Sequence, residues 1–226
     1  MPSSYPPNTP AVPHGAIVLL DPDTGAVRRV ITLQYNPDTV TRTLQPQGVG
    51  AQGGDAGEAL RLKGPAQETL KVDVELNATD QLENPFGPEA DVVALHGLLP
   101  VLAALDLLVN PSVRALLDQD AAARSGAFEI APAESPLTVF VWSRERVMPV
   151  RITDFAVTEE AFDSRLRPIR AKVSLSLRVL TVDDLGFTHR GGTLFLAHQR
   201  RREQLAALYR PEHAGATFLG TSLGGS

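Results

Sequence analysis

The residues of this chain that could do chemistry fall into a few short groups, and none forms a complete reaction site. Gly48, Gly50 and Gly53 match the dinucleotide-binding spacing G-x-G-x-x-G. That spacing holds a pyrophosphate only where it ends a buried strand and opens a helix. Here QPQ precedes the glycines and GDAG follows them, which indicates a long loop over residues 45–57. We therefore expect no nucleotide site.

Two acidic groups have simpler explanations. The D-x-D-x-G at residues 21–25 resembles the start of a calcium loop, but its glycine arrives one position early and its twelfth position is not a glutamate. Its proline and terminal glycine favour a tight hairpin turn. Glu159 and Glu160 are adjacent in a predicted turn between two strands. Neighbouring residues of an extended chain point to opposite faces, so this pair is not expected to act on one bond.

Metal and nucleophile chemistry has no recognisable residue set either. The chain has no cysteine, and its histidines lack the short spacing of a metal site. No G-x-S-x-G, P-loop or S-x-x-K motif is present. We therefore predict that the protein is not an enzyme and uses no cofactor or metal. The histidines are His14, His96, His189, His198 and His213.

The overall composition narrows the class of protein further. With 226 residues, 43% of them hydrophobic, the chain can bury a substantial core. A formal net charge of -5 argues against nucleic acid as a partner, because nucleic-acid binders present basic surfaces. No apolar run reaches the roughly 20 residues of a membrane helix, and residues 1–14 are proline-rich without a secretory pattern. We expect no direct membrane insertion and a cytoplasmic location.

Alternating apolar residues indicate a mainly β (α+β) fold. In residues 169–180, Val173, Leu175, Leu177 and Val179 occupy every second position, so an extended strand places them on one face. The opposite face is polar, which is typical of an antiparallel sheet with one buried side. Similar runs predict strands at residues 16–20, 27–35, 60–62, 70–76, 137–142 and 147–155.

Helical spacing is found in three further segments. Residues 91–109 carry apolar side chains three and four positions apart, although Gly97 and Pro100 predict a break. Residues 112–123 and 193–209 predict two more helices. We divide the chain into a flexible arm (1–14), a β domain (15–190) with a helical insertion at about 84–136, a C-terminal helix (191–210) and a tail (211–226).

Five segments, taken in order, resemble a known family. They are LQYNPDTVTRTL (33–44), LNATDQLE (76–83), LLPVLAALDLLV (98–109), FVWSRERVMPVRITDFAVTEEAFD (140–163) and LRPIRAKVSLSLRVL (166–180). Together they look like the tube and baseplate hub proteins of contractile injection systems. These are phage-tail-like particles that drive a rigid tube through a membrane. The similarity covers residues 15–205.

The resemblance implies a fold, a role and a set of partners. The fold would be a tube-protein fold of two packed antiparallel sheets or a small barrel, with six copies closing into a ring. The role would be a hub or tube initiator between the spike and the inner tube. The partners would be further copies of the chain, the spike protein, inner-tube proteins and other baseplate subunits. Some members carry a LysM domain that has no counterpart here, so we expect no peptidoglycan binding.

A small set of residues is the candidate assembly interface. Residues 34–37 form either a contact loop or the turn that ends a strand. The aromatic side chains of the set are either interface anchors or parts of the core. Two charged residues complete it. The candidates are Gln34, Tyr35, Asn36, Pro37, Trp142, Glu160, Phe162 and Arg178.

Two alternative functions stay open. The first is the main inner-tube subunit of the same particle, although the 84–136 insertion and the proline-rich arm are large for a part stacked many times. The second is a cell-wall or carbohydrate-binding β module, which fits a β-rich domain with exposed loops. Copy number per particle separates the first from a hub subunit, and glycan binding tests the second.

Overall fold

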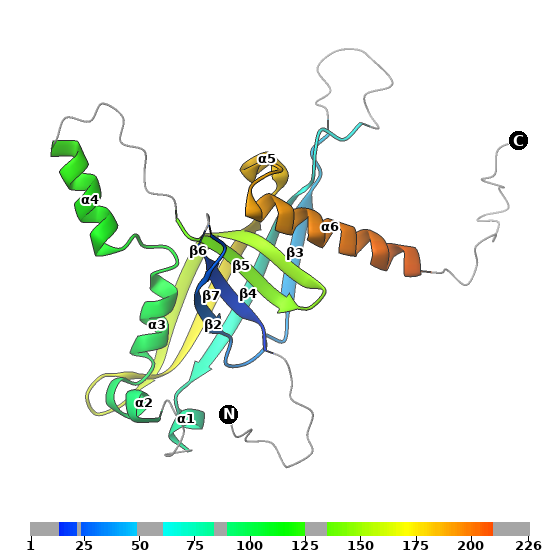
Figure 1. The fold of residues 1–226 in the computed structure, drawn as a ribbon. Coiled ribbons are helices and arrows are strands. Elements are labelled where there is room, and N and C mark those ends of the chain that lie inside the picture. The colour runs from blue at the N-terminus through cyan, green and yellow to red at the C-terminus, as the bar shows by residue number, and fades with distance from the viewer. Residues whose placement is uncertain (1–13, 22–23, 49–60, 84–89, 125–134, 210–226) are drawn as a thin grey trace, which may run out of the picture.

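Seven antiparallel strands form one open sheet in the order β2-β1-β5-β6-β7-β4-β3 (Figure 1). The computed structural model describes residues 14–21, 24–48, 61–83, 90–124 and 135–209. The strands are β1 (Ala16–Leu20), β2 (Val27–Thr32), β3 (Val40–Gln45), β4 (Gln67–Asn77), β5 (Leu137–Ser143), β6 (Arg146–Phe162) and β7 (Pro168–Val179). The helices are α1 (Thr79–Leu82), α2 (Ala90–His96), α3 (Leu99–Asp106), α4 (Val113–Arg124), α5 (Val182–Leu185) and α6 (Arg190–Leu208).

The order of the strands shows how the sheet is assembled. Strands β5, β6 and β7 pair in succession as a meander. The two N-terminal strand pairs add to its two sides: β1 pairs with β5 and carries β2, whereas β4 pairs with β7 and carries β3. Strands β2 and β3 are therefore the open edges of the described sheet.

The buried face of the sheet is built from apolar residues in register. Val74 of β4 and Val157 of β6 both pair with Val173 of β7, and the same alignment repeats along these strands. The inward side chains of β4 and β7 are almost fully buried. Cross-strand apolar pairs of this kind stabilise a sheet in proportion to the area that they remove from water.

A bulge in β6 keeps its apolar residues on the buried side. The pairing with β7 shifts between Ile152 and Asp154, which leaves Thr153 as the extra residue. Beyond it, Phe155 and Val157 face the core, although they are three and five positions after Ile152. Without the bulge, strict alternation would turn both side chains to solvent.

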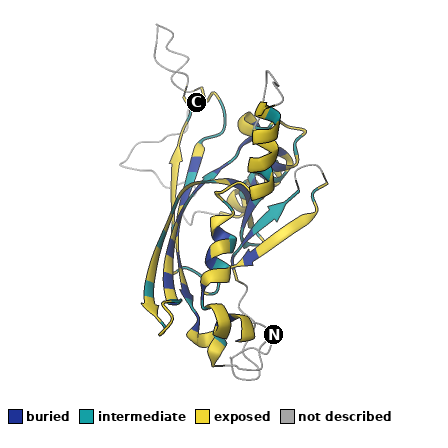
Figure 2. Ribbon diagram, turned by 90° about the vertical axis from the view of Figure 1, so that its left-hand side faces the viewer, coloured by how far each residue is buried: buried dark blue, intermediate teal, exposed yellow. Residues whose placement is uncertain are grey.

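Helices α2 and α3 cover the concave side of this curved sheet (Figure 2). Gly97 separates them in a left-handed conformation (φ 59°), and a Cβ there would lie 2.6 Å from the carbonyl oxygen of Pro168. Helix α4 differs, because it has no buried side chain and stands away from the sheet (Figure 1). The buried residues of this segment are Ala90, Val93, Leu98, Leu102 and Leu105.

Helices α5 and α6 follow directly after β7, at the end of the sheet where that strand stops. Thr181 and Asp184 form a reciprocal capping box at the start of α5. The Nδ1 atom of His189 accepts from the backbone N–H of Gly191, 3.0 Å away, at the start of α6. Phe195 and His198 are the large side chains that α6 buries.

The structure confirms most of the predicted architecture. The antiparallel strands, the helical insertion split near Gly97 and the C-terminal helix are all present. The strands form one open sheet rather than two separate sheets or a closed barrel. The turn assigned to Glu159 and Glu160 was wrong, because both lie within β6, and α1, β3 and α5 were not predicted. In the segment predicted as a strand at 60–62, the described residues form only an isolated bridge between Leu62 and Gly48. The arm (except His14), the tail and most of the glycine-rich loop lie outside the described residues.

Candidate functional site

The predicted interface residues fall at two ends of the sheet. Asn77 at the end of β4 pairs with Arg170, which in turn pairs with Glu160 of β6. This end, which also holds residues 34–37 and Phe162, is the turn end. Arg178 lies at the opposite end of β7, the pocket end, where Trp142 lines a pocket. The eight candidates therefore do not form one continuous surface.

At the turn end, residues 34–37 are engaged within the chain. The side-chain amide of Gln34 donates to the carbonyl of Asn77 (2.6 Å) and accepts from its N–H (2.8 Å). Asn36 accepts from the N–H of Gly15 at 2.9 Å. The Tyr35 hydroxyl donates to Asp80, and burial together with this bond raises the pKa of Tyr35 to about 12. These contacts hold the strand-ending turn in place, and Pro37 is half-buried beside them.

The charged candidates also have partners within the chain. Glu160 lies 3.2 Å from Arg170 and 3.5 Å from Lys172, and Arg178 lies 2.6 Å from Asp184. Phe162 differs, since it is 48% exposed near the tip of the β6–β7 turn. Among the candidates it is the apolar side chain that offers the most open surface.

The β6–β7 turn is attached to the helical insertion through Arg167. Its guanidinium pairs with Asp163 at 2.5 Å and donates to the carbonyls of Ala94 and Leu95 at the end of α2. The hydrogen bonds from Arg167 hold the pKa of Asp163 at about 2, below its usual 3.8. Leu98 N–H adds a bond of 3.0 Å to the carbonyl of Pro168.

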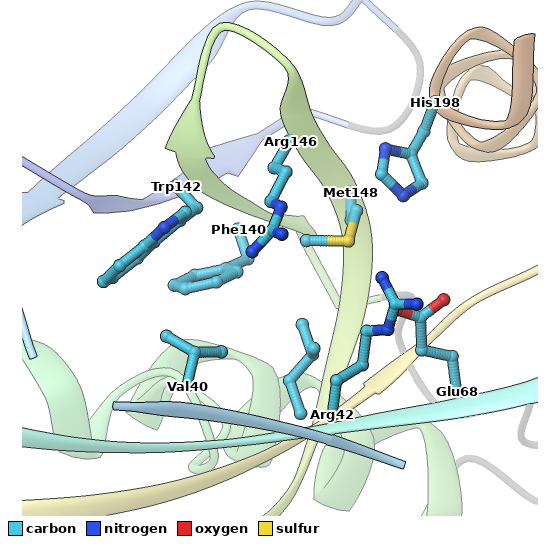
Figure 3. A pocket seen from close by; sticks show the side chains of 9 residues that line it. Val40, Arg42, Glu68, Phe140, Trp142, Arg146, Met148 and His198 are labelled. Atoms are coloured by element: carbon cyan, nitrogen blue, oxygen red, sulfur yellow. The ribbon is translucent and has the colours of Figure 1, made fainter. Parts of the chain in front are cut away.

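The pocket end contains a cavity of about 330 Å³ between the two halves of the curved sheet (Figure 3). Strands β3 and β4 form one wall, the β5–β6 hairpin forms the other, and α6 contributes His198. Phe140 and Trp142 stack with ring centroids 6.0 Å apart. The lining residues are Val40, Arg42, Glu68, Leu70, Phe140, Trp142, Arg146, Met148 and His198.

A buried carboxylate organises the charges of this pocket. Glu68 is 3% exposed, and its Oε2 accepts from the guanidinium of Arg202 at 3.0 Å. Its Oε1 has no hydrogen bond and lies 3.4 Å from Nε of Arg42. Two arginines from different elements therefore compensate one buried negative charge, as a buried carboxylate requires.

Two further polar side chains in the pocket have no partner among the described residues. His198 is 6% exposed, and neither of its ring nitrogens makes a hydrogen bond. Burial, followed by the charge of Arg202, lowers the pKa of His198, so the ring is neutral at neutral pH. The guanidinium of Arg146 points into the pocket and makes no hydrogen bond or ion pair within the described structure (Figure 3).

Sequence reasoning missed this cluster, although one signal was readable. Glu68 occupies the same alternating phase as Leu70 and Val72, so a charged residue stands where the strand is otherwise apolar. The spacing of the histidines gives no reason to single out His198. Its proximity to Arg146 depends on how α6 crosses the β5–β6 hairpin, which local patterns do not encode.

The pocket lining combines charged, apolar and aromatic side chains. Its lining contains no serine, threonine or cysteine that a base could activate. In the described part of the chain, no three His, Cys, Asp or Glu side chains are grouped as a metal site would require. No helix of the described residues is long and apolar enough to cross a membrane.

No protein-family model matches the chain, and no curated protein matches it.

Proposed function

We propose that this chain is a structural hub or tube-initiator subunit of a contractile injection system, linking the spike to the inner tube. The five ordered segments that resemble this family support the assignment. A tube-protein-like role of this kind is carried by surfaces and requires no catalytic group. The surfaces that the structure leaves open are therefore the features that bear on it.

The observation that carries an assembly role is the exposed apolar face of α4. Val113 is 73% exposed and Leu117 is 62% exposed, and Leu116 lies on the same side of the helix. A helix with no buried side chain gains nothing from its apolar residues within the monomer. Contiguous exposed apolar residues mark protein contacts, and we assign this face to a neighbouring subunit of the particle.

The open sheet edges support the proposed ring of six copies. All residues of β3 except its first are exposed, and so are all residues of β2 except Ile31. Free edges invite pairing with other strands, and a closed ring of subunits covers them. The hub proposal therefore explains the α4 face and the sheet edges with the same neighbours.

A deletion and complementation experiment tests the proposal. In a host that makes the particle, we expect removal of the gene to abolish tube assembly while spike and sheath proteins are still made. Leu117→Glu should fail to restore assembly, although the purified variant melts at the wild-type temperature. Gln119→Glu adds the same charge outside the apolar face and should restore it. Normal particles in the deletion strain would contradict the proposal.

Copy number separates the hub from the main tube subunit. A hub or initiator ring is present in a fixed, small number of copies, whereas a tube subunit increases in number with tube length. Quantitative mass spectrometry of particles of two different lengths measures this directly. We expect the ratio of this chain to the spike protein to be the same in both.

A further inference from the structure

We propose that the pocket between β3, β4 and the β5–β6 hairpin is a binding site for an organic carboxylate with an apolar body. The site goes beyond the hub role and does not depend on it. Three features of the lining residues in Figure 3 point to such a ligand: two side chains without partners among the described residues, an excess of positive charge and an aromatic wall.

The unused hydrogen-bonding capacity of a buried histidine points to a ligand. His198 is buried and lines the pocket, yet neither ring nitrogen has a partner in the described structure. Buried polar atoms are almost always satisfied by protein, water or ligand. A neutral imidazole offers one donor and one acceptor, so it complements a bound polar group of either kind.

The charges of the pocket select an anion. Arg42 and Arg202 share the single carboxylate of Glu68, and Arg146 adds a guanidinium without a partner among the described residues. With His198 neutral, positive charges exceed negative ones around the cavity. A planar guanidinium binds a carboxylate through two parallel hydrogen bonds, which favours this anion over a spherical one.

The remaining lining gives the ligand its apolar body. Phe140 and Trp142 stack on one wall, and Met148 and Leu70 extend the apolar surface beside them. A phenyl or alkyl group therefore has a place next to the guanidinium of Arg146 (Figure 3). The volume of about 330 Å³ is near the lower end of the range of roughly 300–1,000 Å³ that small-molecule sites occupy.

Two sources could supply this chemistry: a free aryl or alkyl acid, or the C-terminal residue of a peptide. Both present a carboxylate beside an apolar group, so both fit the same wall and the same arginine. A free acid needs only the cavity, whereas a peptide terminus also needs a path for the preceding residues. The relative affinities of a small acid and a dipeptide distinguish the two.

Trp142 provides a built-in reporter, because it is the only tryptophan of the chain and lines the pocket. The full-length protein is titrated with 3-phenylpropionate while tryptophan fluorescence is recorded. We expect a saturable change with the acid and at least about tenfold weaker binding of 3-phenylpropionamide, which has the same body without the charge. No saturable change with any probe, or equal binding of acid and amide, would overturn the proposal.

A matched pair of variants tests the assigned arginine. Arg146→Gln removes the guanidinium that points into the pocket, and Arg151→Gln makes the same change on the outward face of β6. We expect Arg146→Gln to weaken binding of the acid about tenfold and Arg151→Gln to leave it unchanged. Both side chains are exposed, so the melting temperature should stay near wild type. Equal affinity of Arg146→Gln and wild type would contradict the site.

A dipeptide separates the two sources of the ligand. N-acetyl-Ala-Phe with a free carboxylate is compared with 3-phenylpropionate in the same assay. Tighter binding of the dipeptide would identify a peptide C-terminus as the ligand class, and tighter binding of the small acid would identify a free organic acid. Either outcome supports the carboxylate site, whereas failure of both probes would reject it. A failed hub assay would leave this result unaffected.

Discussion

The two ends of the central strands are built in opposite ways. At the turn end, Gln34, Tyr35 and Asn36 make their hydrogen bonds to the chain itself, and Arg167 joins the β6–β7 turn to α2. The pocket end lies some nine residues, or about 30 Å, away along β4. There, the side chains of His198 and Arg146 have no such partners among the described residues.

This comparison distinguishes polar groups that stabilise the fold from polar groups that a ligand can bind. The turn end contains most of the residues that the sequence predicts as an interface, yet its polar groups already stabilise the fold. The pocket end contains the groups that a ligand can still satisfy. A set of polar and aromatic residues therefore identifies a binding surface only after their internal partners have been counted.

Among the proposed substitutions, a charge buried in the strands that join the two ends should destabilise the protein most. Leu175 is 3% exposed and lies in register between β4 and β6. Leu175→Asp should destabilise the protein by about 4 kcal/mol, because it buries an unpaired charge. Thr158→Asp makes a similar change on the exposed face opposite Lys172 and should change stability by less than about 1 kcal/mol. Urea denaturation measures both, and equal midpoints would refute the strand assignment.

A pair of glycine substitutions tests the packing at the turn end. Gly97→Ala places a methyl group 2.6 Å from the carbonyl oxygen of Pro168 at a positive φ, so we expect a loss of about 2–3 kcal/mol. Gly48 has no positive φ, and a Cβ added there would meet no atom within 4 Å. Gly48→Ala should therefore change stability by less than about 1 kcal/mol. Similar losses for the two would mean that α2 does not pack against the turn as described.

The buried carboxylate gives a third comparison. Arg202→Gln removes one of the two cations beside Glu68 and should destabilise the fold by about 1–3 kcal/mol. Arg201 is the adjacent residue and pairs with Glu145, and both of these side chains are partly exposed to water. Arg201→Gln should therefore change stability by less than about 1 kcal/mol. Thermal unfolding of both variants is the measurement, and a larger loss for Arg201→Gln would contradict the described pocket.

The smallest expected effect is a pH dependence at the turn end. The pKa of Asp163 is about 2 in the folded chain, whereas the same carboxyl without these hydrogen bonds has a pKa of 3.8. A depressed pKa means that this group stabilises the fold above pH 3.8 and that the contribution is lost as the pH falls toward 2. Asp163→Asn should lack this acid-side loss, whereas Glu159→Gln, which removes an equal charge, should keep it. Identical profiles of melting temperature against pH for wild type and Asp163→Asn would contradict the Arg167 contacts.

Much of the sheet could be predicted because burial on one face leaves an alternating pattern. Strand β7 is the clearest case, and Gly97 correctly indicated the break between α2 and α3. Strand β3 lacked a pattern because it is an exposed edge. The second half of β6 was mistaken for a turn because the bulge at Thr153 changes the phase of its apolar residues.

The pocket was less accessible to sequence reasoning. Arg42, Glu68, Arg146 and His198 come from four different elements, and their meeting depends on the curvature of the sheet and the path of α6. The charged residue in the apolar phase of β4 was the local signal. The partners of that residue are set by tertiary packing alone.

The most direct test of the proposed function is cryo-EM of particles from a host that carries a labelled copy of this chain. The hub proposal predicts label only at the spike end, at the first ring of the tube. Label along the whole tube would make the chain the main tube subunit, and particles without label would reject an assembly role in this machine.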